Sequence, residues 1–351
     1  MLRNFRPGWR RPALLVASLA LVAGAYVVVA AEKADVTDLA PQAISITAHP
    51  INFASSDPAK RDFGRLTYLG GVILTSGSDY FGGYSGIALD AKGEQFLAIS
   101  DAASWLSGKL DYKDGKISGI KDARIGAIPE KSGKALPKGH RDAESLVALK
   151  AGALDGRYLI GFERRHRIEE YAFENGEMRG PVAKRQLPEP LKGMKSNSGL
   201  EAVGVLRGGP YAGAMVAFAE RKLTADGNQI GALVKDGKAH PVFVAAAGDY
   251  SITDVQGLSD GGLVLLERNF NPASRRLDIR LRRVKAADVK PGAVMAAETV
   301  LDAGPGLEID NFEGLAVSQN AAGDTVLTII SDDNFNFFQR TLLMQFKLNQ
   351  N

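Results

Sequence analysis

Short runs of apolar residues alternate with polar turns along most of the chain, and the runs recur as a unit. Each unit opens with a polar residue and an apolar run, turns at Gly or Asp, and closes with a second apolar run ending at an acid. Five such segments cover residues 84–101, 142–164, 198–221, 253–270 and 311–335. Short apolar runs between turn residues are typical of β-strands, and a repeat of this length indicates a propeller or a solenoid.

Further strand-like runs lie between the five segments. Three pairs of turn residues recur at a similar place in the repeat, Asp114-Gly115, Asn175-Gly176 and Asp236-Gly237. Such pairs favour the positive φ angles of a two-residue hairpin. Helical periodicity is absent beyond residue 31, which argues against an α/β fold. Four antiparallel strands per repeat predict the blade of a β-propeller rather than the unit of a solenoid.

The repeat count predicts an all-β protein with one propeller of five four-stranded blades over residues 65–351. After Glu313, the last repeat has room for about three strands. We therefore expect the strand-like residues 65–74 to complete the last blade and close the ring. Residues 32–64 form an N-terminal lead segment, and a sixth, degenerate blade hidden in them is the alternative.

Equivalent positions of the repeats are expected to meet, because the innermost strand of each blade lines the central channel. The openings of the segments carry Ser85, Glu144, Glu201, Gln256 and Glu313. Two residues earlier, on the same strand face, stand Gly83, Asp142, Gly199, Asp254 and Asn311. The second apolar runs end in Asp101, Glu163, Glu220, Glu267 and Asp332. We therefore expect two rings of polar residues, both rich in carboxylates, at the channel.

These rings predict a calcium site. Carboxylates held close together raise one another's pKa unless a cation neutralises them. A set of six to eight oxygen ligands favours calcium over zinc or copper. The predicted ligands are Asp142, Glu144, Glu201, Asp254, Gln256, Glu313 and Asp332. The alternative is that these side chains bond neighbouring backbone amides and hold no ion.

Candidate catalytic side chains flank the rings. Arg164, Arg221 and Arg268 each follow an acid of the second ring directly. Arginine binds phosphate and carboxylate bidentately, so these residues are candidates to stabilise developing negative charge, with salt bridges between blades as the alternative. His140 precedes Glu144 by four residues and is the candidate general acid or base, with a simple loop role as the alternative.

The motifs DAESL, GFER, SGLEAV, FAER, DNFEGLAV and SDDNF, in this order, resemble a bacterial family. It is the family of phytase-like proteins, also described as "esterase-like activity of phytase". The resemblance covers roughly residues 65–348. It implies an exported β-propeller that hydrolyses phosphate or carboxylic esters.

The amino terminus predicts export. Residues 1–31 contain four arginines, no acid, and an apolar stretch from Pro12 to Ala31 that ends in small residues. This is the pattern of a secretory signal, and an uncleaved membrane anchor is the alternative because the stretch is just long enough to span a bilayer. The expected location is therefore the periplasm or the outside of the cell.

Composition removes several classes of function. The chain has no cysteine, which excludes thiolate metal sites and a cysteine nucleophile. The net charge of +3 comes from the amino terminus, since 39 basic and 40 acidic residues remain beyond residue 31. We therefore expect no nucleic-acid binding. No G-x-S-x-G, P-loop or H-E-x-x-H motif occurs.

Two functions from different classes remain. The first is a calcium-dependent hydrolase acting on a small phosphate or carboxylic ester. The second is a non-catalytic propeller that binds a small anionic ligand or a protein, with calcium in a structural role. In either case we expect a monomer.

Overall fold

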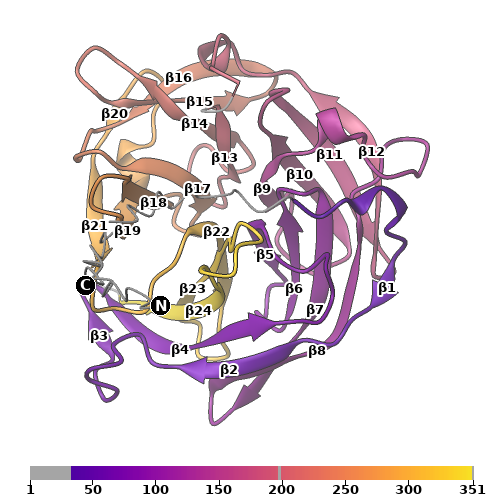
Figure 1. Ribbon diagram of the computed structural model, residues 1–351. Helices are drawn as coiled ribbons and strands as arrows, with labels where there is room; N and C mark the ends of the chain where they lie inside the picture. The colour runs from indigo at the N-terminus through magenta and orange to yellow at the C-terminus, as the bar shows by residue number, and fades with distance from the viewer. Residues whose placement is uncertain (1–32, 197–198, 350–351) are drawn as a thin grey trace, which may run out of the picture. The chain divides into compact units, whose positions relative to one another are not determined.

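Five antiparallel sheets form a ring in the computed structural model, which describes residues 33–196 and 199–349 (Figure 1). The innermost strands of the sheets contact one another in sequence around the ring: β5, β9, β13, β17 and β22. The predicted all-β fold and the five-bladed propeller are confirmed, and the six-bladed alternative is wrong. The proposed signal in residues 1–31 lies outside the described residues.

Blades 1 and 2 follow the predicted plan of an inner strand and successive hairpins. From the channel outward, blade 1 contains β5 (Tyr84–Leu89), β6 (Gln95–Ser100), β7 (Ser104–Lys113), β8 (Lys116–Ala127) and the short outer strand β1 (Gln42–Ala43). Blade 2 contains β9 (Ala143–Ala148), β10 (Gly156–Phe162), β11 (Arg167–Glu174) and β12 (Glu177–Arg185).

Blades 3 and 4 are built in the same way. Blade 3 contains β13 (Leu200–Val205), β14 (Met215–Leu223), β15 (Gln229–Lys235), β16 (Lys238–Val244) and, parallel to it, β20 (Val294–Met295). Blade 4 contains β17 (Ser251–Gly257), β18 (Leu263–Asn271), β19 (Arg276–Val284) and β21 (Ala297–Ala303).

Blade 5 joins the two ends of the described chain. Its strands are β22 (Phe312–Gln319), β23 (Thr325–Ser331), β24 (Thr341–Leu348), β4 (Leu66–Thr75) and β2 (Thr47–Ile51), with β3 (Asp62–Phe63) paired to β4. β4 pairs with β24 from Thr341↔Leu74 to Leu348↔Leu66. The predicted closure of the ring by residues 65–74 is therefore confirmed.

Residues of the lead segment extend existing blades instead of forming one of their own. β1 pairs with β8 in blade 1, and β2 pairs with β4 in blade 5. The only helices in the described part of the chain are four single 3₁₀ turns, η1 (Val36–Asp38), η2 (Lys138–His140), η3 (Glu189–Leu191) and η4 (Ala286–Asp288). None of these helices is long and apolar enough to cross a membrane.

The three turn pairs close the outer hairpins of blades 1, 2 and 3. Lys113 pairs with Lys116, Glu174 with Glu177, and Lys235 with Lys238. The first turn residues, Asp114, Asn175 and Asp236, have φ between 50° and 54°, and the glycine after each has φ 74°. Both central residues of a type I′ turn need positive φ, which explains why Asp-Gly and Asn-Gly stand there.

The core lies between the faces of neighbouring blades. Trp105 of blade 1 is fully buried, and its ring meets that of Phe173 in blade 2 edge to face at 5.7 Å. Similar apolar clusters join the other blades. Packed blades fix the positions of the inner strands, and these strands position the candidate site.

Candidate active site

Each inner strand contains a β-bulge near its start. At this point one residue has no partner on the neighbouring strand of its blade. The bulged residues are Ser85, Glu144, Glu201, Thr253 and Glu313. A bulge re-aims a side chain and is frequent beside active sites. The bulges therefore define the residues that are equivalent around the channel.

The predicted alignment of blade 4 with the other blades is wrong by three residues. The sequence pattern predicts Gln256 as the blade 4 equivalent of Glu144 and Glu201, whereas the pairing of β17 with β18 places Thr253 at the bulge. The physical reason is a shorter spacing in the chain, since Thr253 follows Glu201 by 52 residues whereas the other neighbouring bulged residues are 57 to 60 residues apart. This correction also changes the blade 4 member of the second ring. The residue at this position is Arg268, which pairs with Ser251, whereas the other blades have an acid there.

The second ring consequently contains four acids and one arginine. Each of the four acids donates its backbone N–H to the carbonyl oxygen of the residue directly before the inner strand of its own blade. These acids are Asp101, Glu163, Glu220 and Asp332, and the fifth position is Arg268. Glu267 is not a ring residue: it is fully buried and forms ion pairs with Arg280 and Arg282 of β19.

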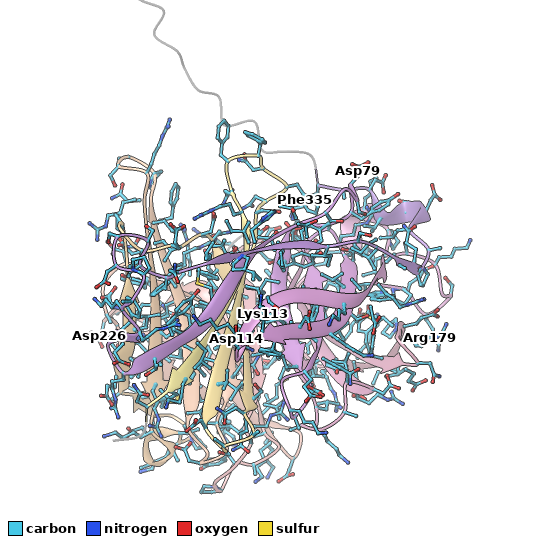
Figure 2. The ribbon with its side chains drawn as sticks, turned by 90° about the horizontal axis from the view of Figure 1, so that it is seen from below. Asp79, Lys113, Asp114, Arg179, Asp226 and Phe335 are labelled. Carbon is cyan, nitrogen blue, oxygen red and sulfur yellow. The ribbon has the colours of Figure 1, made fainter. Side chains whose placement is uncertain are left out.

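The ring lies at the end of the propeller where Phe335 and Asp79 are found (Figure 2). Gly83 marks this position, since a Cβ atom there would lie 2.5 Å from the Phe335 ring and 2.6 Å from the Asp101 carboxylate. Its φ of 68° also favours glycine. The absence of a side chain at residue 83 lets the Phe335 loop pack against the ring.

Five carboxylates of blades 2 and 3, taken from both predicted rings, lie close together, and all the polar residues at this end of the channel are called the ring from here on. Asp142, Glu144 and Glu163 can place one oxygen each within 4.8 Å of one another. Glu163, Glu201 and Glu220 form a second group of the same size. Glu163 belongs to both groups, and its Oε1 accepts the Gly199 N–H at 2.9 Å.

Two of these carboxyl groups have strongly raised pKa values. Burial raises the pKa of Glu144 well above its usual range, and the charges of Glu201 and Glu313 raise it further. The pKa of Glu201 is raised by burial and then by Glu220 and Glu163, which outweigh the lowering by Arg268. Neighbouring carboxylates therefore disfavour the charged form of both groups.

Two basic side chains neutralise Asp101 and Asp142 of the ring. Lys33 Nζ lies 2.7 Å from Asp101 and 2.6 Å from Asp142. Arg164 Nε lies 2.6 Å from the other oxygen of Asp142. In the described residues, no lysine or arginine forms an ion pair with Glu144 or Glu201.

Arg268 neutralises the opposite side of the ring. It donates to Glu313 at 2.7 Å and to the Asn311 amide oxygen, both in blade 5. Burial lowers the pKa of Arg268, but Glu313, Glu201 and Glu220 outweigh burial and raise it. Arg221 is far more exposed, at 69%, and its ion pair among the described residues is with Glu220, at 3.6 Å.

Two of the predicted calcium ligands lie outside this cluster. Asp254 is fully buried, and its oxygens accept the N–H groups of Leu315 and Val255, each at 2.7 Å. Inner-strand N–H groups that face the channel have no partner strand, so a buried acid satisfies one here. Gln256 is buried beside Asp254, and its amide lowers the pKa of that acid.

The remaining predicted ligands do join the ring. Glu313 contacts Arg268, and Asp332 is electrostatically linked to Glu313 and Asp101. Asp332 Oδ1 also accepts the Asn334 N–H at 2.6 Å. The carboxylates brought together therefore include Asp142, Glu144, Glu201, Glu313 and Asp332 from the prediction, together with Asp101, Glu163 and Glu220.

His140, the predicted general acid or base, belongs to a side pocket, whereas His166 lies beside the ring. His140 contacts Arg165 and lines a cavity on the outer part of blade 2. His166 packs against Gly199, where a Cβ atom would lie 1.8 Å from its ring. Its Nε2 lies 2.9 Å from the Lys195 carbonyl oxygen, so Nε2 donates and Nδ1 is left as a buried acceptor without a partner among the described residues.

The donor set fits a hard divalent cation. All its donors are carboxylate oxygens, and burial together with neighbouring carboxylates raises the pKa values of Glu144, Glu163 and Glu201. Calcium binds six to eight oxygens in flexible geometry, which suits such a set better than it suits zinc. Lys33 was missed by sequence reasoning because nothing near it in sequence links it to Asp142, 109 residues away.

Comparisons with known proteins give one family and several distant folds. A search of curated proteins found no match. An endo-arabinase from Bacteroides thetaiotaomicron is 12% identical, with a TM-score of 0.43 over 75% of this chain and 92% of that one. A gluconolactonase from Xanthomonas campestris is 11% identical, with a TM-score of 0.37 over 90% and 91%. Similarities this low carry no argument about activity.

The family comparison covers the whole site. The model described as "Phytase-like: Esterase-like activity of phytase" matches residues 79–335. This range contains all five bulges and all the acids of the ring. Since the match spans well over half of the sequence, the chain belongs to the Phytase-like family.

Proposed function

We propose that this propeller is an exported, calcium-dependent hydrolase of small phosphate or carboxylic esters, acting as a monomer. The observation that carries the proposal is the pair of carboxylate groups sharing Glu163, two of whose acids have no basic partner in the described structure. Membership of the Phytase-like family supports the reaction class. Export is supported by the pattern of residues 1–31, and an uncleaved anchor there would keep the protein membrane-bound.

The acids of blades 2 and 3 have the role of cation ligands in this proposal. When bound, calcium supplies Lewis-acid chemistry, polarising an ester oxygen and making a nearby water more acidic. Asp142, Glu144, Glu163, Glu201 and Glu220 would hold it. Asp142 is shared with Lys33 and Arg164, so its charge is already partly compensated.

One further side chain completes the proposed mechanism. Arg268 is the basic residue at a ring position, and its guanidinium would stabilise an oxyanion that develops on the substrate. The ring hydroxyls are unsuited as nucleophiles, because Ser85 donates to the Ala143 carbonyl and Thr253 to that of Phe312.

Turnover of a panel of phosphate monoesters, carboxylic esters and lactones, with calcium or with a chelator, tests the proposal. We expect turnover to need calcium and Glu201→Gln to lower kcat at least about 100-fold, since it removes a ligand charge. Glu94→Gln, an exposed change away from the ring, is the matched control. Unchanged turnover in Glu201→Gln would disprove the mechanism.

The alternative is a non-catalytic propeller that binds a small anion or a protein. The observation favouring it is that Ser85 and Thr253, the ring hydroxyls, are both engaged between blades. A calcium-dependent rise in melting temperature, with no substrate of the panel turned over, would support this alternative.

A further inference from the structure

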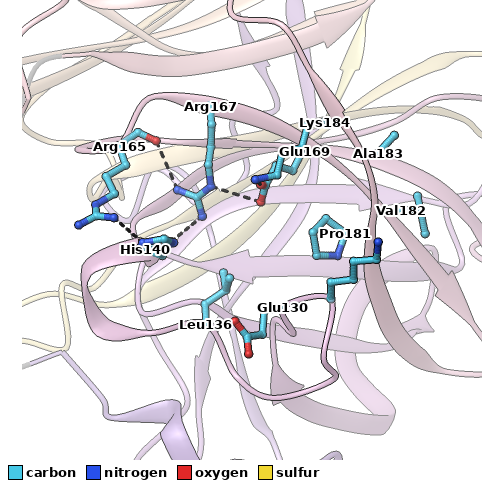
Figure 3. A pocket seen from close by; sticks show the side chains of 11 residues that line it. Glu130, Leu136, His140, Arg165, Arg167, Glu169, Pro181, Val182, Ala183 and Lys184 are labelled. Carbon is cyan, nitrogen blue, oxygen red and sulfur yellow. Dashed lines mark hydrogen bonds and ion pairs between the residues drawn. The ribbon is translucent and has the colours of Figure 1, made fainter.

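A cavity of about 540 Å³ lies on blade 2, apart from the carboxylate ring (Figure 3). One wall comes from the loop between β8 and β9, with Glu130, Leu136 and His140. The other wall comes from β11 and β12, with Arg167 and residues 181–184. Cavities of this size hold small organic ligands.

The floor of this cavity is a buried acid with its own counter-charges. Glu169 is only 4% exposed and accepts from Arg167 at 3.2 Å, with Lys184 at 3.4 Å. Arg167 also donates to the His140 carbonyl at 2.5 Å and lies 3.6 Å from the centre of the Phe162 ring. Arg167 is therefore fixed in place, and Glu169 is already neutralised.

Positive charge is left over at the rim. Arg165 and Lys131 line the cavity, and in the described chain no carboxylate forms an ion pair with either. The Arg165 guanidinium donates to His140 Nε2, which requires the unprotonated nitrogen. Burial, Arg165 and Arg167 all lower the pKa of His140, consistent with a neutral ring. The remaining N–H groups of Arg165 are thus available to a ligand.

Part of the cavity lining is apolar. Leu136 contributes to it from one wall and Pro181 and Val182 from the other, and Val182 is 45% exposed. Apolar lining together with an unpaired guanidinium suits a ligand with an oxyanion at one end and a short apolar group at the other.

We propose that this cavity binds a small organic anion, a carboxylate or a phosphate monoester carrying a compact apolar group. Arg165 holds the oxyanion, with Lys131 as a further unpaired positive charge at the cavity, and Leu136, Pro181 and Val182 contact the apolar group. The proposal is independent of the proposed hydrolase. Arg164 contacts the ring acid Asp142, whereas the next residue, Arg165, turns to the cavity.

Calorimetric titration of the full chain, in chelator so that nothing is turned over, tests the cavity. The probes are phenyl phosphate, benzoate and the uncharged benzyl alcohol. We expect one of the two anions to bind and benzyl alcohol not to. Arg165→Ala should weaken binding at least about tenfold, because a charge-assisted bidentate contact is lost. Arg165→Lys should recover part of the affinity.

Two controls separate the cavity from general surface charge. Arg179→Ala removes an exposed arginine of β12 that is paired with Glu177 at 2.8 Å, and it should leave the affinity unchanged. Val182→Asp places a negative charge on the exposed apolar part of the lining and should weaken anion binding without disturbing the core. If neither anion binds, or if Arg165→Ala and Arg179→Ala behave alike, the proposal is wrong, and the hydrolase proposal is unaffected.

Discussion

At the scale of single residues, Glu163 has an unusual position because it is shared by two groups of carboxylates. Its pKa is raised by burial, while the Gly199 N–H and a hydrogen bond with Glu201 act in the opposite direction. Asp142 and Glu220 raise it again. The folded protein therefore holds this carboxyl group among like charges, at a cost that a bound cation would relieve.

Replacing Glu163 by Gln should separate the two effects. Gln keeps the shape but removes the charge, so calcium affinity should fall at least about tenfold, as expected for loss of a ligand charge. The metal-free protein should lose no stability, because one repulsive charge is gone. Calcium titration and thermal melting in chelator measure the two results. A clear loss of metal-free stability, with calcium affinity intact, would assign Glu163 a purely structural role.

At the scale of strands, β4 closes the ring with residues far from β24 in sequence. Leu74 is 2% exposed and pairs with Thr341, and Val72 pairs with Leu343. Since β4 supplies part of the same core as β24, we expect the ring to unfold as a unit rather than to open at blade 5.

Leu74→Ala should lower the free energy of unfolding by about 2–5 kcal/mol, the usual effect of truncating a buried leucine. The neighbouring exposed Thr75→Ala should change it by no more than about 0.5 kcal/mol. Chemical denaturation followed by circular dichroism gives both values. Equal, small effects of the two changes would show that β4 is only loosely attached.

Strand-level features also show how far sequence reasoning reaches. The closure by residues 65–74 and the hairpins at Asp114-Gly115 and Asn175-Gly176 depend on local patterns, and all were predicted correctly. Blade 4 was misaligned because Thr253 follows Glu201 by only 52 residues, so a match at nearly constant spacing falls on Gln256 instead. Thr253 is neither acidic nor an amide, so composition gave no reason to prefer it over Gln256.

At the scale of the whole molecule, the ring links stability to pH. Burial raises the pKa of Glu144, Glu201 and Asp332 well above their usual values. Between the ordinary glutamate value of 4.5 and these raised values, the folded protein binds more protons than the unfolded chain. The free energy of unfolding must therefore fall as pH rises through this window. His140, whose pKa is lowered, has the opposite effect, but it is a single half-buried group.

Metal-free protein should accordingly melt at a higher temperature at about pH 5.5 than at about pH 7.5. Saturating calcium should flatten or reverse this trend, because a bound cation favours the ionised carboxylates and stabilises only the folded state. Melting curves at several pH values, with and without calcium, measure both slopes. Glu201→Gln should reduce the slope of the metal-free protein, whereas exposed Glu94→Gln should not. A melting temperature that rises with pH in chelator would mean that the ring carboxylates are already compensated, which would remove the electrostatic basis for a cation in the channel.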